Sequence, residues 1–470
     1  MSTPATDSVS RLEGIVGATA FVAEPEKLSA HEIDGMAPSA ALLPSCQQEV
    51  VEIVKFAASE DLALVPCGAR TKLGIGMRPV RYDVAVDLSR LNKIDAYDPD
   101  DLTLSVEPGV KICELQRKLN QHGQFLPHGA PFMTRATIGG TIASGVEGPL
   151  RQMYGTPRDF VLGMEFVTGD GIAGKSGGRV VKNVTGYDLH KLMIGSVGTL
   201  GIITKVNFRT FPAPQSMRGF MAHFGSAADA LRCRDALAAS VLRPMTLDIL
   251  SPRVADLFTS DSAVEIEPNV LPGGVLSRDA WMLTTAFLGN DAVVERCGVE
   301  LQAMVGRAGG SHFARIGDDK TPSALAAAFG RLREFVPIAL RSSPAPVIMK
   351  LAVLPEHLEH AVAAGKHAAH DHSIPWAAVI RGVGVIYLAL LPVARDEKQM
   401  NCVRGAVTRI HGDCARLGGH STVPWCPSEW KTVLSVWGPE ERPDLSLMRK
   451  VKSVFDPRGI LAPGRFAGGI

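Results

Sequence analysis

Four glycines interrupt a single apolar stretch between residues 179 and 204 of this 470-residue chain. The stretch contains Gly186, Gly195, Gly198 and Gly201, and it closes on a β-branched run that ends at Thr204. Glycine is needed where the backbone takes a positive φ, or where another surface approaches closer than a side chain allows. The spacing therefore indicates either a ligand lying directly on main chain or tight packing between neighbouring elements.

Two further glycine-containing loops precede this stretch, at residues 66–76 and 136–148. In the first loop, consecutive main-chain N–H groups can form an anion-binding concavity, to which Arg70 and Lys72 add positive charge. In the second loop, bare backbone and small hydroxyl side chains suit a flat ligand with polar edges. Three such loops in one region, each at a strand-to-turn junction, favour a large phosphate-bearing cofactor.

The first loop differs from the common dinucleotide-binding pattern. Gly74 and Gly76 are followed by Met-Arg-Pro, which does not continue the G-x-G-x-x-G fingerprint. We also expect no phosphate loop of the G-x-x-x-x-G-K-S/T type, and therefore no nucleoside triphosphatase.

Composition narrows the class of protein. Hydrophobic residues make up 46% of the chain and charged residues 21%, which is typical of a folded protein, and the formal net charge is +1. Without a basic run, this charge gives no indication of nucleic-acid binding. We expect a cytoplasmic protein, because no leader sequence and no apolar stretch of the ~18–20 residues that span a membrane is visible. The eight cysteines contain no C-x-x-C pair, which indicates free thiols and no ligand set for an iron–sulfur cluster.

A chain of this length is expected to form two or three domains. Short β-rich runs alternate with helical segments as far as Phe211-Pro-Ala-Pro214, where the prolines indicate a boundary. Alanine-rich helices then alternate with strands, and no internal repeat is visible. The predicted parts are an N-terminal segment (1–36), a first α+β domain (37–214), a second α+β domain (215–425) and a C-terminal helix and tail (426–470).

Several motifs resemble those of a known family. Three segments resemble the flavin-binding domain of the vanillyl-alcohol-oxidase (PCMH-type) family. They are Leu64-Val-Pro-Cys-Gly-Ala-Arg-Thr-Lys-Leu-Gly74, Ala136-Thr-Ile-Gly-Gly140 and Tyr154-Gly-Thr-Pro-Arg-Asp159. Three further segments resemble the second FAD-binding subunits (E subunits) of bacterial glycolate oxidases. They are Lys182-Asn-Val-Thr-Gly-Tyr-Asp-Leu189, Gly198-Thr-Leu-Gly-Ile-Ile203 and the tail from Phe455 to Gly469. The resemblance covers residues 37–214 and 425–470 strongly and the middle weakly. It implies an α+β fold with a two-part FAD-binding domain, a ferredoxin-like α+β cap domain and a tail that returns to the FAD-binding domain.

The resemblance also implies a set of cofactor-binding residues. In the family, the first loop wraps around the FAD pyrophosphate. The resemblance therefore implies pyrophosphate contacts for Gly68, Ala69, Arg70, Thr71 and Lys72. The ribityl chain and isoalloxazine are expected to lie along Thr137, Ile138, Gly139, Gly140, Ser144 and Gly145, with Pro131 as a further cofactor contact and Ile202 and Ile203 near the adenine. Covalent flavoproteins of this family carry a histidine in the first loop. None occurs between residues 66 and 76, so we expect non-covalent FAD.

The catalytic residues are less well defined. A flavin that oxidises a 2-hydroxy acid needs a base for the hydroxyl proton. Catalytic chains of this group resemble one another in a His-x-Gly-Asp-Gly-Asn segment and a Glu-His-Gly segment, and neither occurs here. The remaining candidates for the base are His420 and His190. Each can equally be a packed or solvent-exposed histidine with no catalytic role. The histidines at 357, 360, 367, 370 and 372 have helical spacing but polar neighbours, so we expect a solvated helix face and no metal site.

These observations predict the FAD-bearing subunit of a 2-hydroxy-acid (glycolate-type) dehydrogenase or oxidase complex, which passes electrons to an iron–sulfur subunit. The expected partners are that subunit, a homologous FAD subunit and a small 2-hydroxy acid, and the protein partners would hold the chain peripherally at the inner membrane. Two alternatives stay open. One is a non-catalytic assembly or electron-relay subunit, and the other is a free-standing flavin oxidase of alcohols or sugars.

Overall fold

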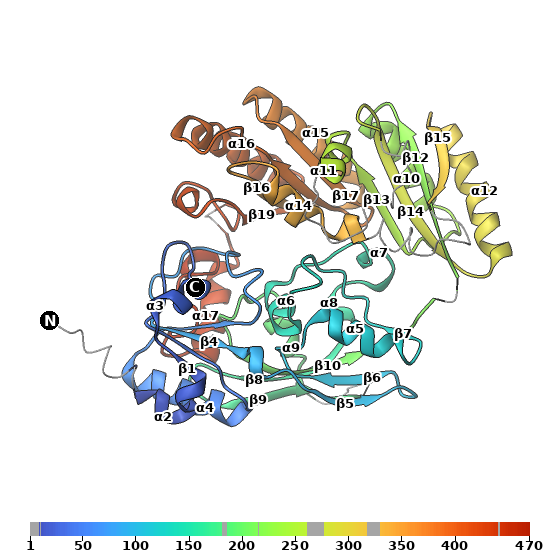
Figure 1. Ribbon diagram of the computed structural model, residues 1–470. Coiled ribbons are helices and arrows are strands. Elements are labelled where there is room, and N and C mark those ends of the chain that lie inside the picture. The colour runs from blue at the N-terminus through green and yellow to red at the C-terminus, as the bar shows by residue number, and fades with distance from the viewer. Residues whose placement is uncertain are drawn as a thin grey trace. The chain divides into compact units, whose positions relative to one another are not determined.

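The computed structural model describes residues 9, 11–180, 186–214, 216–260, 277–316, 330–439 and 442–470, so Lys182 lies outside the described residues. Contacts divide the chain into two compact units (Figure 1). Unit 1 comprises Met1–Glu147, Thr156–Ala213 and Glu440–Ile470, and unit 2 comprises Gly148–Gly155 and Pro214–Pro439. The domain boundaries predicted from the sequence stay predictions.

Unit 1 begins with a small, mostly parallel sheet. Within the described residues its strand order is β1-β2-β4-β3, formed by β1 (Phe21–Val22), β2 (Ala40–Leu42), β3 (Leu64–Cys67) and β4 (Val84–Asp87). Both β2 and β3 run parallel to β4, and Cys67 is the register partner of Asp87. Strands of a buried parallel sheet are continuous apolar runs in the sequence, and Val84-Ala-Val is such a run. The apolar face of α4 (Gln47–Glu60) packs against this sheet through Val50, Ile53 and Val54.

A second sheet completes unit 1. It is antiparallel, with the order β5-β6-β10-β8-β9 in the described part of the chain: β5 (Ile94–Asp98), β6 (Thr103–Val106), β8 (Val161–Val167), β9 (Ala173–Gly177) and β10 (Ile202–Arg209). The accompanying elements are β7 (Gln124–Phe125), β11 (Phe211–Pro212), α2 (Glu13–Val16), α3 (Pro25–Leu28), α5 (Ile112–Asn120), α6 (Ile138–Ser144), α8 (Pro157–Phe160), α9 (His190–Met193) and α17 (Leu445–Phe455), with short η1 (Ala18–Ala20), η2 (Ser29–His31), η3 (Leu88–Arg90) and η6 (Ala467–Gly469). This two-part arrangement confirms the expected α+β class.

The letters of the phosphate-loop pattern do occur, at residues 169–176, contrary to our expectation. The same residues also satisfy G-x-G-x-x-G. In the structure they form the turn between β8 and β9, and Gly174, Lys175 and Ser176 pair with β8 as part of β9. Both patterns bind phosphate only between a strand and a helix, so this hairpin match indicates no phosphate site.

The C-terminal tail is bonded to the first sheet. Leu64 N donates to Ile460 O and Ala462 N donates to Leu64 O, at 2.8 and 2.7 Å, so the tail covers the exposed edge of β3. Lys452, on α17, fixes the start of this tail. Its Nζ donates to Thr199 O and Leu461 O, each at 2.8 Å, and to the buried carboxylate of Asp456.

Unit 2 is built on one antiparallel sheet, and its longer helices share one hydrophobic core with the sheet. Within the described residues the order is β15-β12-β14-β13-β17-β18-β16-β19: β12 (Met217–Phe224), β13 (Thr246–Leu250), β14 (Trp281–Leu288), β15 (Ser311–Ile316), β16 (Val347–Ala352), β17 (Trp376–Arg381), β18 (Val385–Leu390) and β19 (His420–Trp425). The helices are α7 (Arg151–Tyr154), α10 (Ala227–Ala238), α11 (Arg253–Ser260), α12 (Asp291–Arg307), α14 (Phe335–Arg341), α15 (Leu358–Asp371) and α16 (Glu397–Arg416), with η4 (Pro355–His357) and η5 (Ser428–Thr432).

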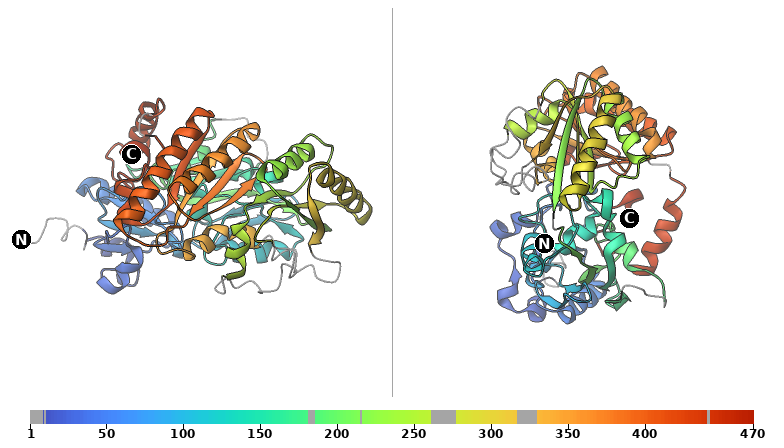
Figure 2. Two further views of the ribbon diagram at one scale, coloured as in Figure 1. Left: turned by 90° about the horizontal axis from the view of Figure 1, so that it is seen from above. Right: turned by 90° about the vertical axis from the view of Figure 1, so that its right-hand side faces the viewer.

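This sheet contains the ferredoxin-like β-α-β-β-α-β motif twice. The first copy runs through β12, α10, β13, β14, α12 and β15, and the second through β16, α15, β17, β18, α16 and β19. The copies join where β13 pairs with β17, and in the second copy α15 and α16 lie side by side (Figure 2). The sequence shows no repeat because the two copies share topology rather than residues. Among the described residues, no helix combines the length and hydropathy needed to cross a membrane.

The Lys452 contacts predict a stability difference between neighbouring lysines. Lys452→Met removes three hydrogen bonds and leaves Asp456 without its cation, so we expect unit 1 to lose about 3 kcal/mol of unfolding free energy. The matched control is Lys450→Met, because Lys450 is exposed on the same helix. Chemical denaturation of both variants checks this, and equal midpoints would contradict the role of Lys452.

Candidate flavin site

One cavity in unit 1 brings the three glycine-containing segments together. It opens at the carboxyl end of β3, where the first loop begins. Its lining comes from residues 66–73 and from parts of the segments 137–144 and 197–203. Leu88, Pro108 and Arg465 complete it. Segments separated by more than half the chain therefore form a single concave surface.

Most of the predicted cofactor-binding residues line this cavity: Gly68, Ala69, Arg70, Thr71, Lys72, Thr137, Gly139, Gly140, Ser144 and Ile203. The others, Pro131, Ile138, Gly145 and Ile202, are not among its lining residues. Ile138 and Ile202 are instead fully buried in two of the hydrophobic cores of unit 1. Neighbouring residues of a helix or strand point in different directions, so a residue next to a lining residue can face the core instead of the cavity.

Several glycines around the cavity are explained by packing within the protein. A Cβ atom on Gly68 would lie 2.3 Å from Thr137 Oγ1, and one on Gly139 would lie 2.5 Å from Pro108 Cβ. Gly198 has a φ of +76° and its Cβ would lie 2.6 Å from Pro66 Cγ. Gly140 is different, because its Cβ would meet only Thr137 Oγ1, at 3.2 Å. At Gly140 the open side is therefore the cavity.

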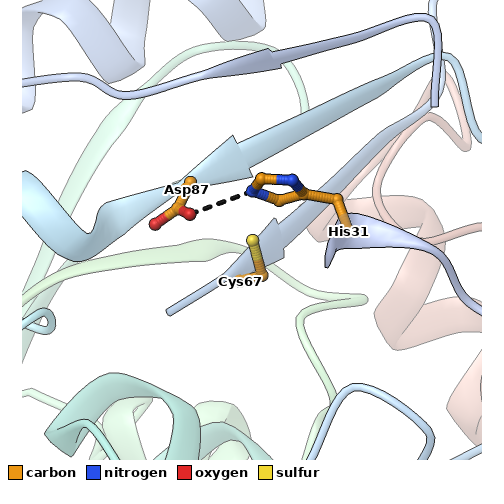
Figure 3. Close-up of side chains that lie close together, drawn as sticks. All are labelled: His31, Cys67 and Asp87. Carbon is orange, nitrogen blue, oxygen red and sulfur yellow. Dashed lines mark hydrogen bonds and ion pairs between the residues drawn. The ribbon is translucent and has the colours of Figure 1, made fainter. Parts of the chain in front are cut away.

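The first loop is held by a polar cluster beneath it. Arg70 has a φ of +59°, a left-handed conformation that costs a non-glycine residue about 1–2 kcal/mol. Its guanidinium donates to the buried carboxylate of Asp87 and lies 3.3 Å from His31 Nε2. His31 Nε2 lies 3.0 Å from Asp87 Oδ2, and Cys67 lies beside both (Figure 3). Sequence analysis missed His31 and Asp87, because no local motif connects them to the loop.

Lys72 lines the cavity beside a neutral histidine. Its Nζ lies 5.4 Å from the centroid of the Phe132 ring. His128 is buried, and burial together with the nearby Lys72 charge lowers the pKa of His128 to about 3. His128 therefore carries no charge at neutral pH. Of these two residues, Lys72 is the one that contributes positive charge.

Arg465, from the C-terminal tail, closes the cavity. Its guanidinium donates to Leu73 O and Ile75 O in the first loop, and 2% of the residue is exposed. Burial lowers the pKa of Arg465 to about 10, so it remains protonated at neutral pH. Together with Arg70 and Lys72 it makes the lining basic, and none of the described lining residues is acidic.

The two candidate catalytic histidines lie outside this lining. His190 Nδ1 lies 3.0 Å from Ser176 Oγ, and burial lowers the pKa of His190. His420 is exposed at the start of β19 in unit 2, opposite Ala352. The histidines of η4 and α15 are half-buried or exposed among acidic and basic neighbours. In the described part of the chain, the one histidine-containing group with metal-ligand spacing is His31, Cys67 and Asp87.

Two family profiles match the chain. The family described as "FAD binding domain" matches residues 38–174, which contain the first two glycine loops. The family described as "FAD linked oxidases, C-terminal domain" matches residues 213–422 and 436–466, which make up half of the chain. The chain belongs to the FAD-linked oxidase family. It is therefore an FAD-dependent oxidoreductase, and the expected PCMH-type fold and FAD cofactor are confirmed.

Curated relatives of this FAD-linked oxidase differ in how much of it they match. Glycolate oxidase subunit GlcD of Bacillus subtilis is 26% identical over 91% of this chain and 88% of its own length. D-2-hydroxyglutarate dehydrogenase of Xanthomonas citri is 27% identical over 91% of this chain and 89% of its own length. Glycolate oxidase subunit GlcE of Escherichia coli is 38% identical, but over 36% of this chain and 48% of its own length.

Solved structures share the fold of this oxidase. p-Cresol methylhydroxylase is 20% identical with a TM-score of 0.79, and the match covers 99% of this chain and 97% of that one. 4-Ethylphenol oxidase from Gulosibacter chungangensis is 17% identical with a TM-score of 0.77 and the same coverage. At these identities the likeness shows the fold alone.

The two neighbouring glycines of α6 predict opposite results on substitution. Gly139→Ala pushes a methyl group into Pro108, so we expect a loss of about 2 kcal/mol in unfolding free energy. Gly140→Ala meets only a rotatable hydroxyl and gains helix propensity, so we expect a loss below about 0.5 kcal/mol. Denaturant unfolding of the two variants measures the difference, and similar losses would show that Gly140 also faces packed protein.

Proposed function

We propose that the cavity of unit 1 binds FAD non-covalently, and that the chain is the flavin-bearing subunit of a 2-hydroxy-acid dehydrogenase. The observation that carries this proposal is the composition of the cavity lining. Three glycine-containing segments present main chain to one space, and the charged lining side chains are the basic residues Arg70, Lys72 and Arg465. A pyrophosphate group with a flat ring system fits that combination of exposed backbone and positive charge.

The lining suggests how the parts of the cofactor are distributed. The first loop, residues 68–72, offers main-chain N–H groups and positive charges of the kind that bind a pyrophosphate. Thr137, Gly140 and Ser144 offer small side chains to the ribityl chain and ring, and Ile203 offers an apolar contact near the adenine. Ile138 and Ile202 are buried in hydrophobic cores of unit 1, and the cofactor contacts of Pro131 and Gly145 stay predictions. No histidine lies in the first loop, which favours non-covalent binding.

The substrate class follows from the relatives and from the chemistry of flavin. A bound FAD would supply a hydride acceptor for the oxidation of an alcohol, and that oxidation also needs a base for the hydroxyl proton. Glycolate oxidase subunits and D-2-hydroxyglutarate dehydrogenase are named for 2-hydroxy acids. We infer that this chain belongs to an enzyme with a substrate of the same class.

The proposal assigns this chain to the E type of subunit. The segment similar to GlcE is the most identical of the curated matches quoted above. The histidine-containing motifs of the catalytic chains do not occur in the sequence, and His190 is held by Ser176. The eight cysteines contain no cluster-binding pair, so onward single-electron transfer is assigned to an iron–sulfur partner.

A second candidate is a self-sufficient 2-hydroxy-acid dehydrogenase. The observation that favours it is coverage, because GlcD and D-2-hydroxyglutarate dehydrogenase match this chain over 91% of its length. In that case a base would come from residues outside the known motifs.

We expect the purified chain to be yellow and to release its flavin when denatured. Heat or acid should leave the absorbance of free FAD in the supernatant, because no loop histidine tethers the ring. The measurement is the visible spectrum of the supernatant and pellet after precipitation. Flavin retained by the washed pellet would contradict non-covalent binding.

We expect 2-hydroxy acids to reduce the flavin of the isolated chain slowly. A positioned base typically contributes about 10²–10⁴-fold, and the E-type assignment places that base on a partner. Anaerobic bleaching near 450 nm is followed with glycolate, lactate and 2-hydroxyglutarate, first for the chain alone and then with a homologous flavin subunit and an iron–sulfur subunit. Fast bleaching of the isolated chain would favour the self-sufficient dehydrogenase.

A further inference from the structure

A buried polar cluster lies beneath the first loop of the cavity. His31 ends η2, Cys67 ends β3 and Asp87 ends β4, and their polar atoms all lie within 4.8 Å of one another (Figure 3). Cys67 and Asp87 are register partners on adjacent parallel strands, so their side chains point to the same face of the sheet. A group of this composition can hold a transition metal or another cation.

In this protein the cation at the cluster is part of the chain. Arg70 Nη1 donates to the Asp87 carboxylate and lies 3.3 Å from His31 Nε2. A metal ion would have to displace this guanidinium from the carboxylate. It would also need the Cys67 thiolate, whereas burial and the Asp87 charge raise the pKa of the Cys67 thiol well above its usual range. The cluster is therefore an acceptor site for Arg70.

Asp87 is a fixed acceptor. The residue is 2% exposed, and its Oδ1 accepts from Ser89 N at 2.9 Å while Oδ2 accepts from Arg70. Burial raises the pKa of Asp87, but hydrogen bonds from His31 and Ser89 and the Arg70 charge outweigh burial and lower it overall. The carboxylate is thus ionised at neutral pH and held in one orientation.

Arg70 contacts both the Asp87 carboxylate and the cavity. Its side chain is 34% exposed, and the residue lines the cavity in the loop that begins at Gly68. Its positive φ is a conformation that glycine adopts freely and other residues adopt at a cost. An ion pair to a rigid carboxylate supplies the interaction that holds a non-glycine residue there.

We propose that Arg70 is a positioning residue for FAD, which acts through Asp87 and His31 to hold residues 68–72 in the conformation that binds the pyrophosphate. This inference rests on the proposed function of the cavity. It differs from direct recognition of phosphate by the guanidinium, because the interaction that matters lies between Arg70 and Asp87. Without it, the loop must be ordered when the cofactor binds, and that ordering lowers affinity.

The test is a double-mutant cycle on cofactor binding. Arg70→Gly suits it, because glycine accepts the positive φ and the loop can still fold. Asp87→Asn removes the charge and keeps the shape, and Arg78→Ala is the control, because Arg78 is exposed and does not line the cavity. FAD dissociation constants are measured by flavin fluorescence on the apoprotein, together with the thermal unfolding midpoint of each apoprotein.

We expect Arg70→Gly to weaken FAD binding about tenfold, which corresponds to about 1.4 kcal/mol. The Arg78→Ala protein should bind as the wild type does. The effects of Arg70→Gly and Asp87→Asn should be non-additive, so that the double variant binds no more weakly than the weaker single variant. The unfolding midpoint of Arg70→Gly should fall, because the buried Asp87 carboxylate loses its cation. The double variant removes both charges and should unfold near the wild type, so its weaker FAD binding separates positioning from a general loss of stability.

Two results would overturn the inference and leave FAD binding itself intact. They are wild-type affinity in Arg70→Gly, and additive effects in the double variant, which would indicate that Arg70 contacts the cofactor without Asp87. Zn²⁺ binding to the wild-type protein that disappears in Cys67→Ser would also overturn the assignment of the cluster to Arg70. Failure of the wild-type apoprotein to bind FAD would instead contradict the proposed function.

Discussion

The candidate flavin site depends on the hydrogen bonds of one buried guanidinium group, that of Arg465. It reaches from the C-terminal tail to the first loop and donates to two of its carbonyls, Leu73 O and Ile75 O. A loop that presents its N–H groups to an anion leaves carbonyls pointing the other way, and buried carbonyls need donors. Arg465 supplies those donors and also adds a positive charge to the cavity lining.

The rest of unit 1 supports that contact. The tail covers the edge of β3 through Leu64, and Lys452 bonds its start to Thr199 in the third glycine segment. On the other side of the loop, Arg70 is paired with Asp87. The first loop is therefore held through Arg70 by the nearby strand β4 and through its carbonyls by Arg465 of the C-terminal tail. The proposed cofactor binding by this loop should respond to changes in the tail as well as to changes in the loop itself.

Local chemistry explains which predictions succeeded. The alternation of β-rich and helical runs indicated the α+β class. The glycine loops and the flavoprotein motifs identified the cofactor and most of the residues that line the cavity, because these features are local in the sequence. Residues whose role depends on long-range contacts were missed, namely His31, Asp87 and Arg465. The sequence also gave no sign that residues 148–155 belong to unit 2, or that its sheet repeats one topology. In residues 169–176, the letters of a phosphate loop occur in a hairpin, which shows that such a pattern has meaning only in its structural context.

The most direct measurement of the central claim is calorimetric titration of FAD into the apoprotein of the wild type and of Gly140→Val. Gly140 is the glycine of α6 whose open side faces the cavity, so a branched side chain there should occupy the space of the cofactor and leave the fold intact. We expect saturable binding of one FAD per wild-type chain, and no binding to Gly140→Val at an unchanged unfolding midpoint. Equal binding by the two proteins would contradict the placement of FAD in this cavity.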